Sequence, residues 1–234
     1  MEKWISMVET FCTDPSREKE FNDFYNNTHL PDVLKTPGFM AARRYAIKES
    51  RYGRGKYLTI FEIETDDIDK TIAIRHERRE QEKEQGRAPA VAVPGLILPV
   101  WRDIIFKQIH ELTSDGPFKT GNWINTVELL LADPSREKEF NDAYNNTHLP
   151  DILNTPGYLA VRRFIYEEPR NGRGKYLAVF EIETDDIDKT MATRRERREQ
   201  EKGQGHSMGQ IVPNAFIPFW HDIQFKKIYE LSNK

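Results

Sequence analysis

Cysteine and long apolar runs are the scarcest features of this sequence. Cys12 is the only cysteine among 234 residues, so the chain offers no internal disulfide framework and no thiolate metal site. No apolar run approaches the roughly 18 residues that span a bilayer, and no basic start leads into an apolar signal segment. We therefore expect a cytoplasmic protein with no membrane partner.

An excess of charge of one sign is absent as well. The 35 basic and 38 acidic residues leave a formal net charge of −3 and a pI near 6.1. Binding to nucleic acid depends on a basic surface, and here basic residues alternate with acidic ones, so we expect no nucleic-acid partner. Hydrophobic residues at 38% and charged residues at 31% are ordinary for a folded domain.

What the sequence does contain is the same unit twice. The segment DPSREKEFNDFYNNTHLPDVLKTPGF begins at Asp14 and returns from Asp133 as DPSREKEFNDAYNNTHLPDILNTPGY. Asp133 follows Asp14 by 119 residues, which is too long for a solenoid, whose units have about 20 to 50 residues. We predict two repeats, residues 1–115 and 116–234.

Each repeat is predicted to begin with a strand and a helix. A β-rich run at residues 4–11 precedes Asp14-Pro15. This pair is typical of a helix start, because aspartate accepts hydrogen bonds from the first amides and proline has no amide to leave unpaired. Pro31 disfavours helical geometry in the residue before it, so we expect a break or a kink in the helix just after His29.

The remainder of each repeat predicts a hairpin, a second helix and a closing strand. Strand-like residues 40–47 and 56–65 flank a loop that contains Gly53-Arg54-Gly55. The helix that begins at residues 66–69 becomes RHERREQEKEQ, which predicts a solvated second half held by pairs such as Arg78 with Glu82. The order is β-α-β-β-α-β, a ferredoxin-like unit, and the fold class is α+β.

Apolar side chains occupy both faces of the predicted strand 56–65. Leu58 and Ile60 point away from Tyr57 and Phe61, so helices on one side of the sheet leave an apolar face uncovered. The second repeat is the tethered partner for that face. We predict that the repeats pack sheet to sheet as an intrachain pseudo-dimeric α+β barrel. Homodimerisation through the outer helices stays open.

The segment FNDFYNNTHLPD, followed by TPGF and an Arg-Arg-Tyr strand, resembles the EthD-like branch of the dimeric α+β barrel superfamily. In that branch a Tyr-x-x-x-His-x-Pro pattern ends the first helix, and a Pro-Gly turn leads into the second strand. The resemblance implies a tandem-duplicated barrel. Members of the superfamily include cofactor-free isomerases, polyketide cyclases and dehydratases, haem-degrading monooxygenases and accessory proteins, so the fold alone names no reaction.

His29 and His148 are the first candidates for catalysis. Histidine exchanges a proton near neutral pH, as dehydration, enolisation and aldol cyclisation require. A helix places Tyr25 beside His29, and Tyr144 beside His148, at a spacing of four residues. We predict these four residues as catalytic. The alternative is that each histidine only caps a broken helix end.

Nearby polar side chains are predicted to bind the substrate. They are Asn26, Asn145, Asp32, Asp151, Arg44 and Arg163. The aspartates follow the histidines by three residues and could orient the imidazole through its other nitrogen. The arginines of the second strand either pair with an interior glutamate, Glu9 or Glu62, or hold an acidic substrate. No spacing of ligands within one repeat predicts a metal site.

These candidates favour a cofactor-free acid/base catalyst of the dehydratase, cyclase or isomerase type, acting on a small aromatic, lactone or polyketide-like molecule. A non-catalytic accessory or small-ligand-binding protein is the alternative, followed by a haem-binding monooxygenase-like protein with a histidine as axial ligand. Phe24 in the first repeat is Ala143 in the second, which predicts a larger second pocket. The sequence leaves open whether the protein is an enzyme, its substrate, and whether both pockets work.

Overall fold

The structure is a computed structural model that describes residues 1–166 and 173–233, and the side chains of these residues except those at positions 102, 103, 219 and 221. The chain forms two compact units. Unit 1 contains Met1–Lys107 and Lys227–Lys234, and unit 2 contains Gln108–Lys226. The units therefore differ from the predicted repeats 1–115 and 116–234, because the end of each repeat's last strand belongs to the unit built from the other repeat.

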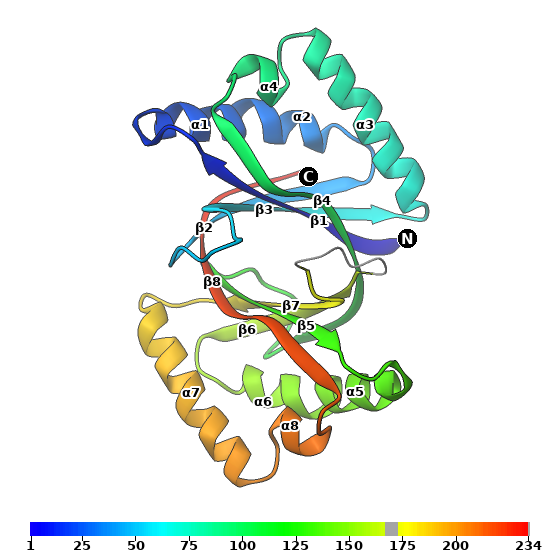
Figure 1. Cartoon of the computed structure of the whole chain (residues 1–234), viewed down its shortest axis with the longest axis vertical. Coiled ribbons are helices and arrows are strands. Elements are labelled where there is room, and N and C mark those ends of the chain that lie inside the picture. The colour runs from blue at the N-terminus through cyan, green and yellow to red at the C-terminus, as the bar shows by residue number, and fades with distance from the viewer. Residues whose placement is uncertain (167–172, 234) are drawn as a thin grey trace. The chain divides into compact units, whose positions relative to one another are not determined.

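Unit 1 is an α+β unit. Its elements in chain order are β1 (Glu2–Cys12), a short 3-10 turn η1 (Pro15–Arg17), α1 (Glu18–Phe24), the π-helical turn η2 (Tyr25–His29), α2 (Leu30–Leu34), β2 (Phe39–Ile47), β3 (Tyr57–Thr65), α3 (Ile68–Glu84), α4 (Pro89–Ala92) and most of β4 (Ile97–Thr113). The strand order is β4-β1-β3-β2, followed by the end of β8 (Phe216–Ser232). The helices lie on one side of these strands (Figure 1).

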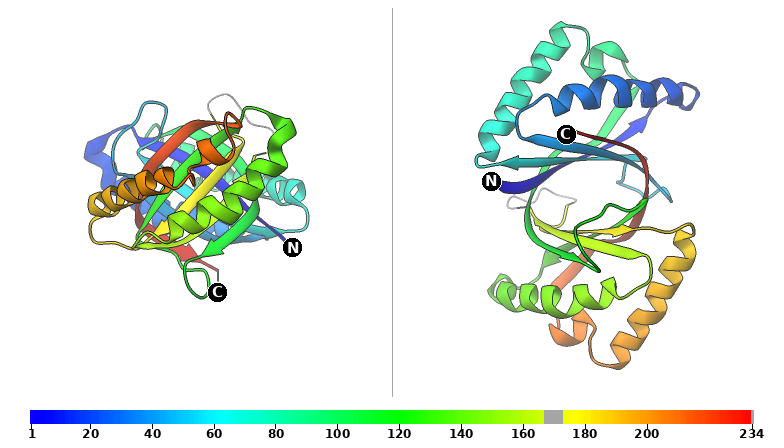
Figure 2. Two further views of the ribbon diagram at one scale, coloured as in Figure 1. Left: turned by 90° about the horizontal axis from the view of Figure 1, so that it is seen from below. Right: turned by 180° about the vertical axis from the view of Figure 1, so that it is seen from behind.

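Unit 2 repeats the same arrangement. Its elements are β5 (Trp123–Leu131), η3 (Pro134–Arg136), α5 (Glu137–Ala143), the π-helical turn η4 (Tyr144–His148), α6 (Leu149–Leu153), β6 (Tyr158–Ile165), β7 (Tyr176–Ile182), α7 (Ile187–Gly203), α8 (Met208–Ile211) and most of β8. The strand order is β8-β5-β7-β6, followed by the end of β4. The further views show its helices on one side of its strands (Figure 2).

The sheet of each unit is antiparallel where its pairing is described. β1 pairs with β3 with Trp4 opposite Ile63, and β5 pairs with β7 with Trp123 opposite Ile182. The elements of unit 1 follow the order β-α-β-β-α-β. The consecutive strands β2 and β3 pair antiparallel, which requires only a short connection between them. Each core lies between the sheet and the helices. Phe21, Leu30 and Phe61 are buried there in unit 1.

The start of the first helix is as expected. Of the break or kink predicted just after His29, the break does not occur, and the irregularity is a π-helical turn that ends at His29. Asp14 Oδ1 accepts a hydrogen bond from Ser16 N at 2.9 Å, next to Pro15. His29 and Leu30 both have right-handed helical dihedrals, and the chain continues from α1 through η2 into α2. The helix widens locally instead of stopping, since Pro31 needs space at the Asn27 carbonyl and cannot donate to it.

The Gly-Arg-Gly loop is more than a hairpin connection. Arg54 extends from it to Glu9, with Nη2 and Oε1 2.6 Å apart and both side chains fully buried. Gly55 N also donates to Glu9 Oε2 at 2.9 Å. A Cβ at Gly55 would lie 2.7 Å from Thr10 N, so only glycine allows this approach. Glu9 is thus paired with Arg54, while Glu62 pairs with Arg43.

Candidate functional site

The π-helical turns bring a tyrosine and a histidine together in each unit. In η2 the Leu30 amide donates to the Tyr25 carbonyl, and in η4 the Leu149 amide donates to the Tyr144 carbonyl. The rings of Tyr25 and His29 meet edge to face with centroids 5.0 Å apart, and those of Tyr144 and His148 with centroids 4.9 Å apart. Single π turns inside α-helices are frequent at functional sites.

A cavity of about 280 Å³ in unit 1 contains the first pair. It lies between the sheet, the π turn, α3 and the segment around α4. Apolar and aromatic side chains form most of it, including Val8, Val33, Phe39, Phe61 and Val93, and Tyr25 and His29 form part of its wall. Such a volume is near the lower limit for pockets that enclose drug-sized ligands.

The corresponding cavity in unit 2 is larger, about 520 Å³. Tyr144 and His148 line it together with Val127, Ile152 and Phe180. The larger second pocket was predicted from the replacement of Phe24 by Ala143. Neither of these residues lines the two cavities. Phe24 instead stacks against His29, with ring centroids 6.1 Å apart, so Ala143 leaves the outer side of the second histidine without this aromatic cover.

The surroundings of His29 favour a neutral imidazole. Burial is the main effect, and the nearby charges of Arg75 and Arg79 add to it, so that the pKa of His29 falls from 6.5 to about 3. Asp32 opposes the shift but does not overcome it. His29 is therefore a hydrogen-bonding group rather than a proton carrier near neutral pH, contrary to the simple expectation for a histidine.

Arg44 and Arg163 are held inside the units rather than in the cavities. Arg44 Nη1 donates to Asn26 Oδ1 at 2.7 Å and Arg44 Nη2 to Asn22 Oδ1 at 2.9 Å, while the guanidinium lies 4.5 Å from the Tyr25 ring centroid. Arg163 makes the matching contacts with Asn145 and Asn141 at 2.6 and 2.8 Å, and lies 4.3 Å from the Tyr144 ring centroid. Burial lowers the pKa of Arg44 to about 10.

These contacts change the interpretation of four residues predicted to bind substrate. The amides of Asn26 and Asn145 and the guanidiniums of Arg44 and Arg163 satisfy one another and support the rings of the tyrosines. None of the four lines a cavity in the part of the chain that the structure describes. Their geometry supports positioning of the tyrosine, not direct contact with a ligand.

Asp32 does not orient His29. Its carboxylate accepts hydrogen bonds from Lys35 Nζ at 2.8 Å and from Arg87 Nε at 2.9 Å. Burial alone would raise the pKa of Asp32, but the hydrogen bonds from Lys35 and Arg87 outweigh it and hold this pKa below its usual value. The aspartate thereby fastens α2 to the segment after α3.

Asp151, the counterpart of Asp32, has different neighbours. Its Oδ2 lies 3.5 Å from Nδ1 of His206, which replaces Arg87. The prediction that these aspartates orient the catalytic imidazoles is therefore wrong for Asp32, and Asp151 faces His206 rather than His148. The three-residue spacing from the histidine points the carboxylate toward the loop, because the wider π turn rotates the residues that follow it.

Arginines of the second helix are the site residues that the sequence analysis missed. Arg75 and Arg79 line the first cavity, and Arg194, Arg195 and Arg198 line the second. Arg75 forms a two-pronged ion pair with Glu82, at 2.6 and 2.8 Å, in place of the predicted Arg78–Glu82 pair. The signal was available: Ile68, Ile72, Arg75, Arg79 and Glu82 follow one another at helical spacing. The second half of α3, which the sequence predicts to be solvated, is thus partly buried at Arg75 and Glu82.

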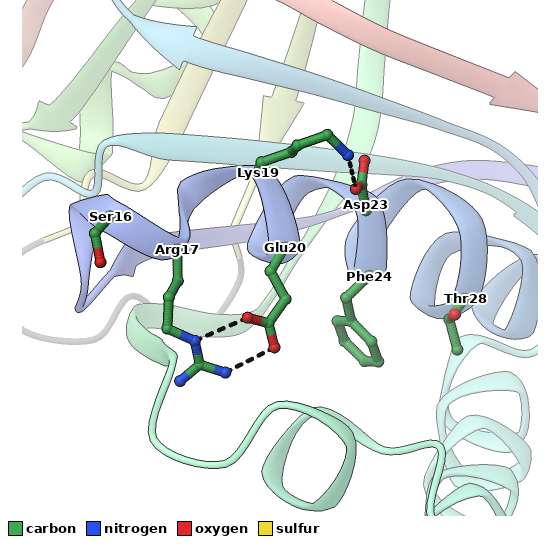
Figure 3. A pocket seen from close by; sticks show the side chains of 7 residues that line it. All are labelled: Ser16, Arg17, Lys19, Glu20, Asp23, Phe24 and Thr28. Carbon is green, nitrogen blue, oxygen red and sulfur yellow. Dashed lines mark hydrogen bonds and ion pairs between the residues drawn. The ribbon is translucent and has the colours of Figure 1, made fainter.

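A third depression, of about 580 Å³, lies on the outer side of α1 and is a different kind of surface (Figure 3). Its charged residues pair with one another: Arg17 donates to Glu20 at 2.7 and 2.8 Å, and Lys19 to Asp23 at 2.5 Å. These pairs follow the i,i+3 and i,i+4 spacing of an exposed helix face. The depression is open, and its charged side chains already have partners in one another, so we do not count it as a candidate site.

Within residues 1–166 and 173–233 no group of three or more histidine, cysteine, aspartate or glutamate side chains could hold a metal ion. Across the same ranges, none of the helices combines the length and apolar character that crossing a bilayer requires.

The comparisons with known proteins indicate the fold of this chain. No protein-family model and no curated protein matches the chain. An anthrone oxidase-like protein of known structure is 14% identical with a TM-score of 0.63, over 99% of this chain and 93% of that one. A protein named as a monooxygenase, from Fusobacterium nucleatum, is 11% identical with a TM-score of 0.55, over 100% and 98%. A chlorite dismutase from Candidatus Nitrospira defluvii is 7% identical with a TM-score of 0.59, over 97% and 92%.

These structures are dimeric α+β barrel proteins, and at such low identities the likeness concerns the fold alone. The chain therefore has an α+β fold of the dimeric α+β barrel type.

Proposed function

We propose that the protein is an acid/base catalyst without a tightly bound cofactor, acting on a small aromatic or polyketide-like molecule that carries an acidic group. The observation that supports this is the same in both units. A tyrosine and a histidine from a π turn stand edge to face in the wall of a cavity, and arginines of the second helix of the same unit line that cavity as well. The names of two similar structures, an anthrone oxidase-like protein and a monooxygenase, are compatible with an aromatic substrate.

The chemistry would be the removal of a proton beside an aromatic carbonyl. The apolar walls hold the ring system, and an arginine attracts its anionic group. A tyrosine hydroxyl donates a hydrogen bond to the carbonyl oxygen, on which negative charge develops. Burial raises the pKa of Tyr144 to about 12, so this phenol keeps its proton at neutral pH and can serve as such a donor. His148 is our candidate for the group that moves the proton.

A non-catalytic, ligand-binding role fits unit 1 better than unit 2. His29, with a pKa of about 3, accepts a proton poorly at neutral pH, and the first cavity is the smaller one. The two alternatives, catalysis and ligand binding, would both hold if the pocket of unit 1 only binds a ligand and the pocket of unit 2 is catalytic. The divergence of the two repeats then has a functional meaning.

Haem does not fit the residues of unit 1. The cavity of about 280 Å³ is at the lower end of the range for drug-sized ligands, and a porphyrin is larger than these. The face of His29 is covered by Phe24 and its edge by Tyr25. We therefore expect that adding haem to the purified protein gives no Soret shift that depends on His29.

Hydrogen exchange on a model substrate tests the proposed catalysis. Anthrone has an exchangeable C–H group opposite its carbonyl, and its exchange for deuterium in D₂O without oxygen can be followed by NMR. We expect the protein to accelerate this exchange, and His148→Gln to lower the acceleration by about 100-fold, the usual size of a general acid/base contribution. His29→Gln serves as the matched variant and should have a much smaller effect. Equal exchange by wild type and His148→Gln would contradict the role of His148.

Other features of the protein stay proposals that rest on the sequence. We propose that the chain belongs to the EthD-like branch in tandem-duplicated form, with the open faces of its two ferredoxin-like sheets buried against each other, and that it works in the cytoplasm with a small-molecule ligand as its partner. Light scattering coupled to size-exclusion chromatography would test whether it also forms a homodimer.

A further inference from the structure

The second cavity contains a polar cluster on its sheet side, which we call the β-face cluster: Asn125 on β5, Tyr158 on β6 and Asp222 on β8. Asn125 Nδ2 donates to Asp222 Oδ1 at 3.0 Å. Asn125 Oδ1 accepts from Gln224 Nε2 at 3.2 Å, and the same nitrogen lies 2.6 Å from the Asp222 carbonyl oxygen. The carboxylate is thus held in place by a network on the sheet side of a cavity whose other walls combine apolar side chains with the charged residues of α7.

The backbone of Asp222 supports a specific role for this cluster. Its φ is +52°, in the left-handed region that residues other than glycine seldom adopt. Such strain persists only where the surrounding structure enforces it, and it is concentrated at functional sites. Here the hydrogen bonds of Gln224 and Asn125 hold the residue so that Asp222 lines the cavity.

The carboxylate also acts on both phenols of this cavity. Burial raises the pKa of Tyr144 and of Tyr158, and the negative charge of Asp222 adds to the rise in both. Tyr158 and Asn125 are each only 3% exposed, so their polar atoms are shielded from bulk water. A ligand hydroxyl that reached them would exchange hydrogen bonds inside a region of low dielectric, where such bonds are strong.

The first repeat lacks most of this cluster. Ser6 stands where Asn125 does, Phe39 where Tyr158 does, and Ile105 where Gln224 does. Asp103 corresponds to Asp222, but its side chain lies outside those that the structure describes. The contrast between the cavities therefore rests on the other three positions. Each of them is apolar or shorter in unit 1, whose cavity is also about half the size.

We propose that the second cavity is the working site and that it binds a hydroxylated aromatic anion, with its hydroxyl groups on the β-face cluster and its acidic group on Arg195 and Arg198 of α7. The cluster lies on the sheet and the arginines on the helix. Two acids of α7 also line the cavity, but Glu201 accepts from Arg194 at 2.8 Å and Glu199 lies 3.9 Å from Lys202. A flat molecule in the cavity therefore meets hydroxyl acceptors on the sheet side and the charges of Arg195 and Arg198 on the helix side.

This inference deepens the proposed function and rests on it for the site, but binding tests it separately from catalysis. Two water-soluble dyes are the probes: anthraquinone-2-sulfonate, and alizarin red S, which adds two adjacent hydroxyls to the same sulfonated ring system. Isothermal titration calorimetry measures the affinity and the number of sites. We expect the wild type to bind alizarin red S about tenfold more tightly than anthraquinone-2-sulfonate, at one high-affinity site per chain.

The decisive variant carries Asn125→Ser and Tyr158→Phe, the residues that the first repeat already has at these positions. We expect it to lose the tenfold preference and to bind both dyes alike. A matched control carries Asn154→Ser and Tyr229→Phe, which change the same residue types outside the cavity lining and should keep the preference. Thermal unfolding of the variants checks that the fold is intact, and the single variant Tyr158→Phe gives a second, milder measurement.

The outcomes separate the two ideas. An unchanged preference in the double variant, no preference in the wild type, or no binding of either dye would overturn the inference. Absence of wild-type deuterium exchange, together with loss of the dye preference in the double variant, would refute the proposed catalysis and keep the inference. Deuterium exchange that depends on His148, without a preference of the wild type for alizarin red S, would keep the proposed catalysis and refute the inference.

Discussion

At the scale of single residues, the buried arginines show most clearly how a charge inside this protein is compensated. Arg44, Arg54, Arg163 and Arg173 are among the largest fully buried side chains. Two of them meet a buried glutamate: Arg54 pairs with Glu9 and Arg173 with Glu128, at 2.6 and 2.7 Å. The other two meet only neutral amides and aromatic faces among their described contacts. Burying an ion removes its hydration, so each must be compensated completely or the fold loses stability.

Removal of one partner of a buried ion pair should therefore be strongly destabilising. We expect Arg54→Met to lower the free energy of unfolding by about 3–5 kcal/mol, because it leaves the Glu9 carboxylate buried without its cation. Urea denaturation followed by circular dichroism measures the change. The double variant Glu9→Gln with Arg54→Met removes both charges and should recover part of the loss. A double variant no more stable than Arg54→Met would show that the charge of Glu9 is not the cause.

At the scale of elements, the π turn decides what the first helix presents to the cavity. A regular helix that stopped after His29 would leave free carbonyls at its end. The sequence therefore left open that the histidine only caps these carbonyls. The continuous helix removes that need. It leaves the imidazole against Tyr25, and it turns Asp32 toward the segment after α3.

The contact between α2 and that segment predicts a pH-dependent stability. Asp32 has a folded-state pKa below its ordinary value of about 3.9, so its ion pairs stabilise the protein above that pH and the contribution is lost as the pH falls through the folded pKa. We expect Asp32→Asn to cost about 1.5 kcal/mol at pH 7, since Lys35 and Arg87 are partly exposed. The difference from wild type should shrink below about pH 4.

Urea unfolding at pH 7 and near pH 3 measures this difference. The matched variant is Asp151→Asn, whose neighbour is His206 instead of Arg87. The contact between Asp151 and His206, at 3.5 Å, is longer than those of Asp32 with Lys35 and Arg87, at 2.8 and 2.9 Å, so a smaller loss is expected there. A cost of Asp32→Asn that stays constant over the acid range would contradict the assignment.

At the scale of the whole molecule, the sequence repeats and the compact units do not coincide. The last eight residues, Lys227–Lys234, belong to unit 1 although they come from the second repeat. Asn233 shows how they are attached: its Nδ2 donates to the Leu34 and Phe39 carbonyls at 2.7 and 2.9 Å, and its backbone amide donates to the Met40 carbonyl at 2.9 Å. Glu230 accepts from Arg43 at 2.8 Å.

Deletion of residues 227–234 should therefore loosen unit 1 more than unit 2. We expect the amides of β2 to lose protection against hydrogen exchange, while those of β6 in unit 2 keep theirs, because local stability follows local contacts. Asn233→Ala should produce a smaller effect in the same place, and Ser232→Ala, at the neighbouring exposed position, little or none. Equal loss of protection in both strands would show that the end of β8 stabilises the molecule in another way.

The sequence by itself determined the duplication, the α+β class, the element order and the helix start at Asp14-Pro15, because these depend on local spacing and on backbone chemistry. It also determined that Tyr25 and His29 would lie together, since four residues of helix separate them. Tertiary structure alone decided which partners the buried charges have: Arg54 for Glu9, two asparagines for Arg44, and Arg87 for Asp32.

The same division holds for the site. Positions far apart in the chain, such as Asn125, Tyr158 and Asp222, share a cavity only because neighbouring strands place them on one face of a sheet. The strength of a charge and the pKa of His29 depend on how much water the surrounding side chains exclude, and a sequence pattern does not specify this. Local order was thus predictable from the residues, whereas solvation and long-range pairing came from the fold.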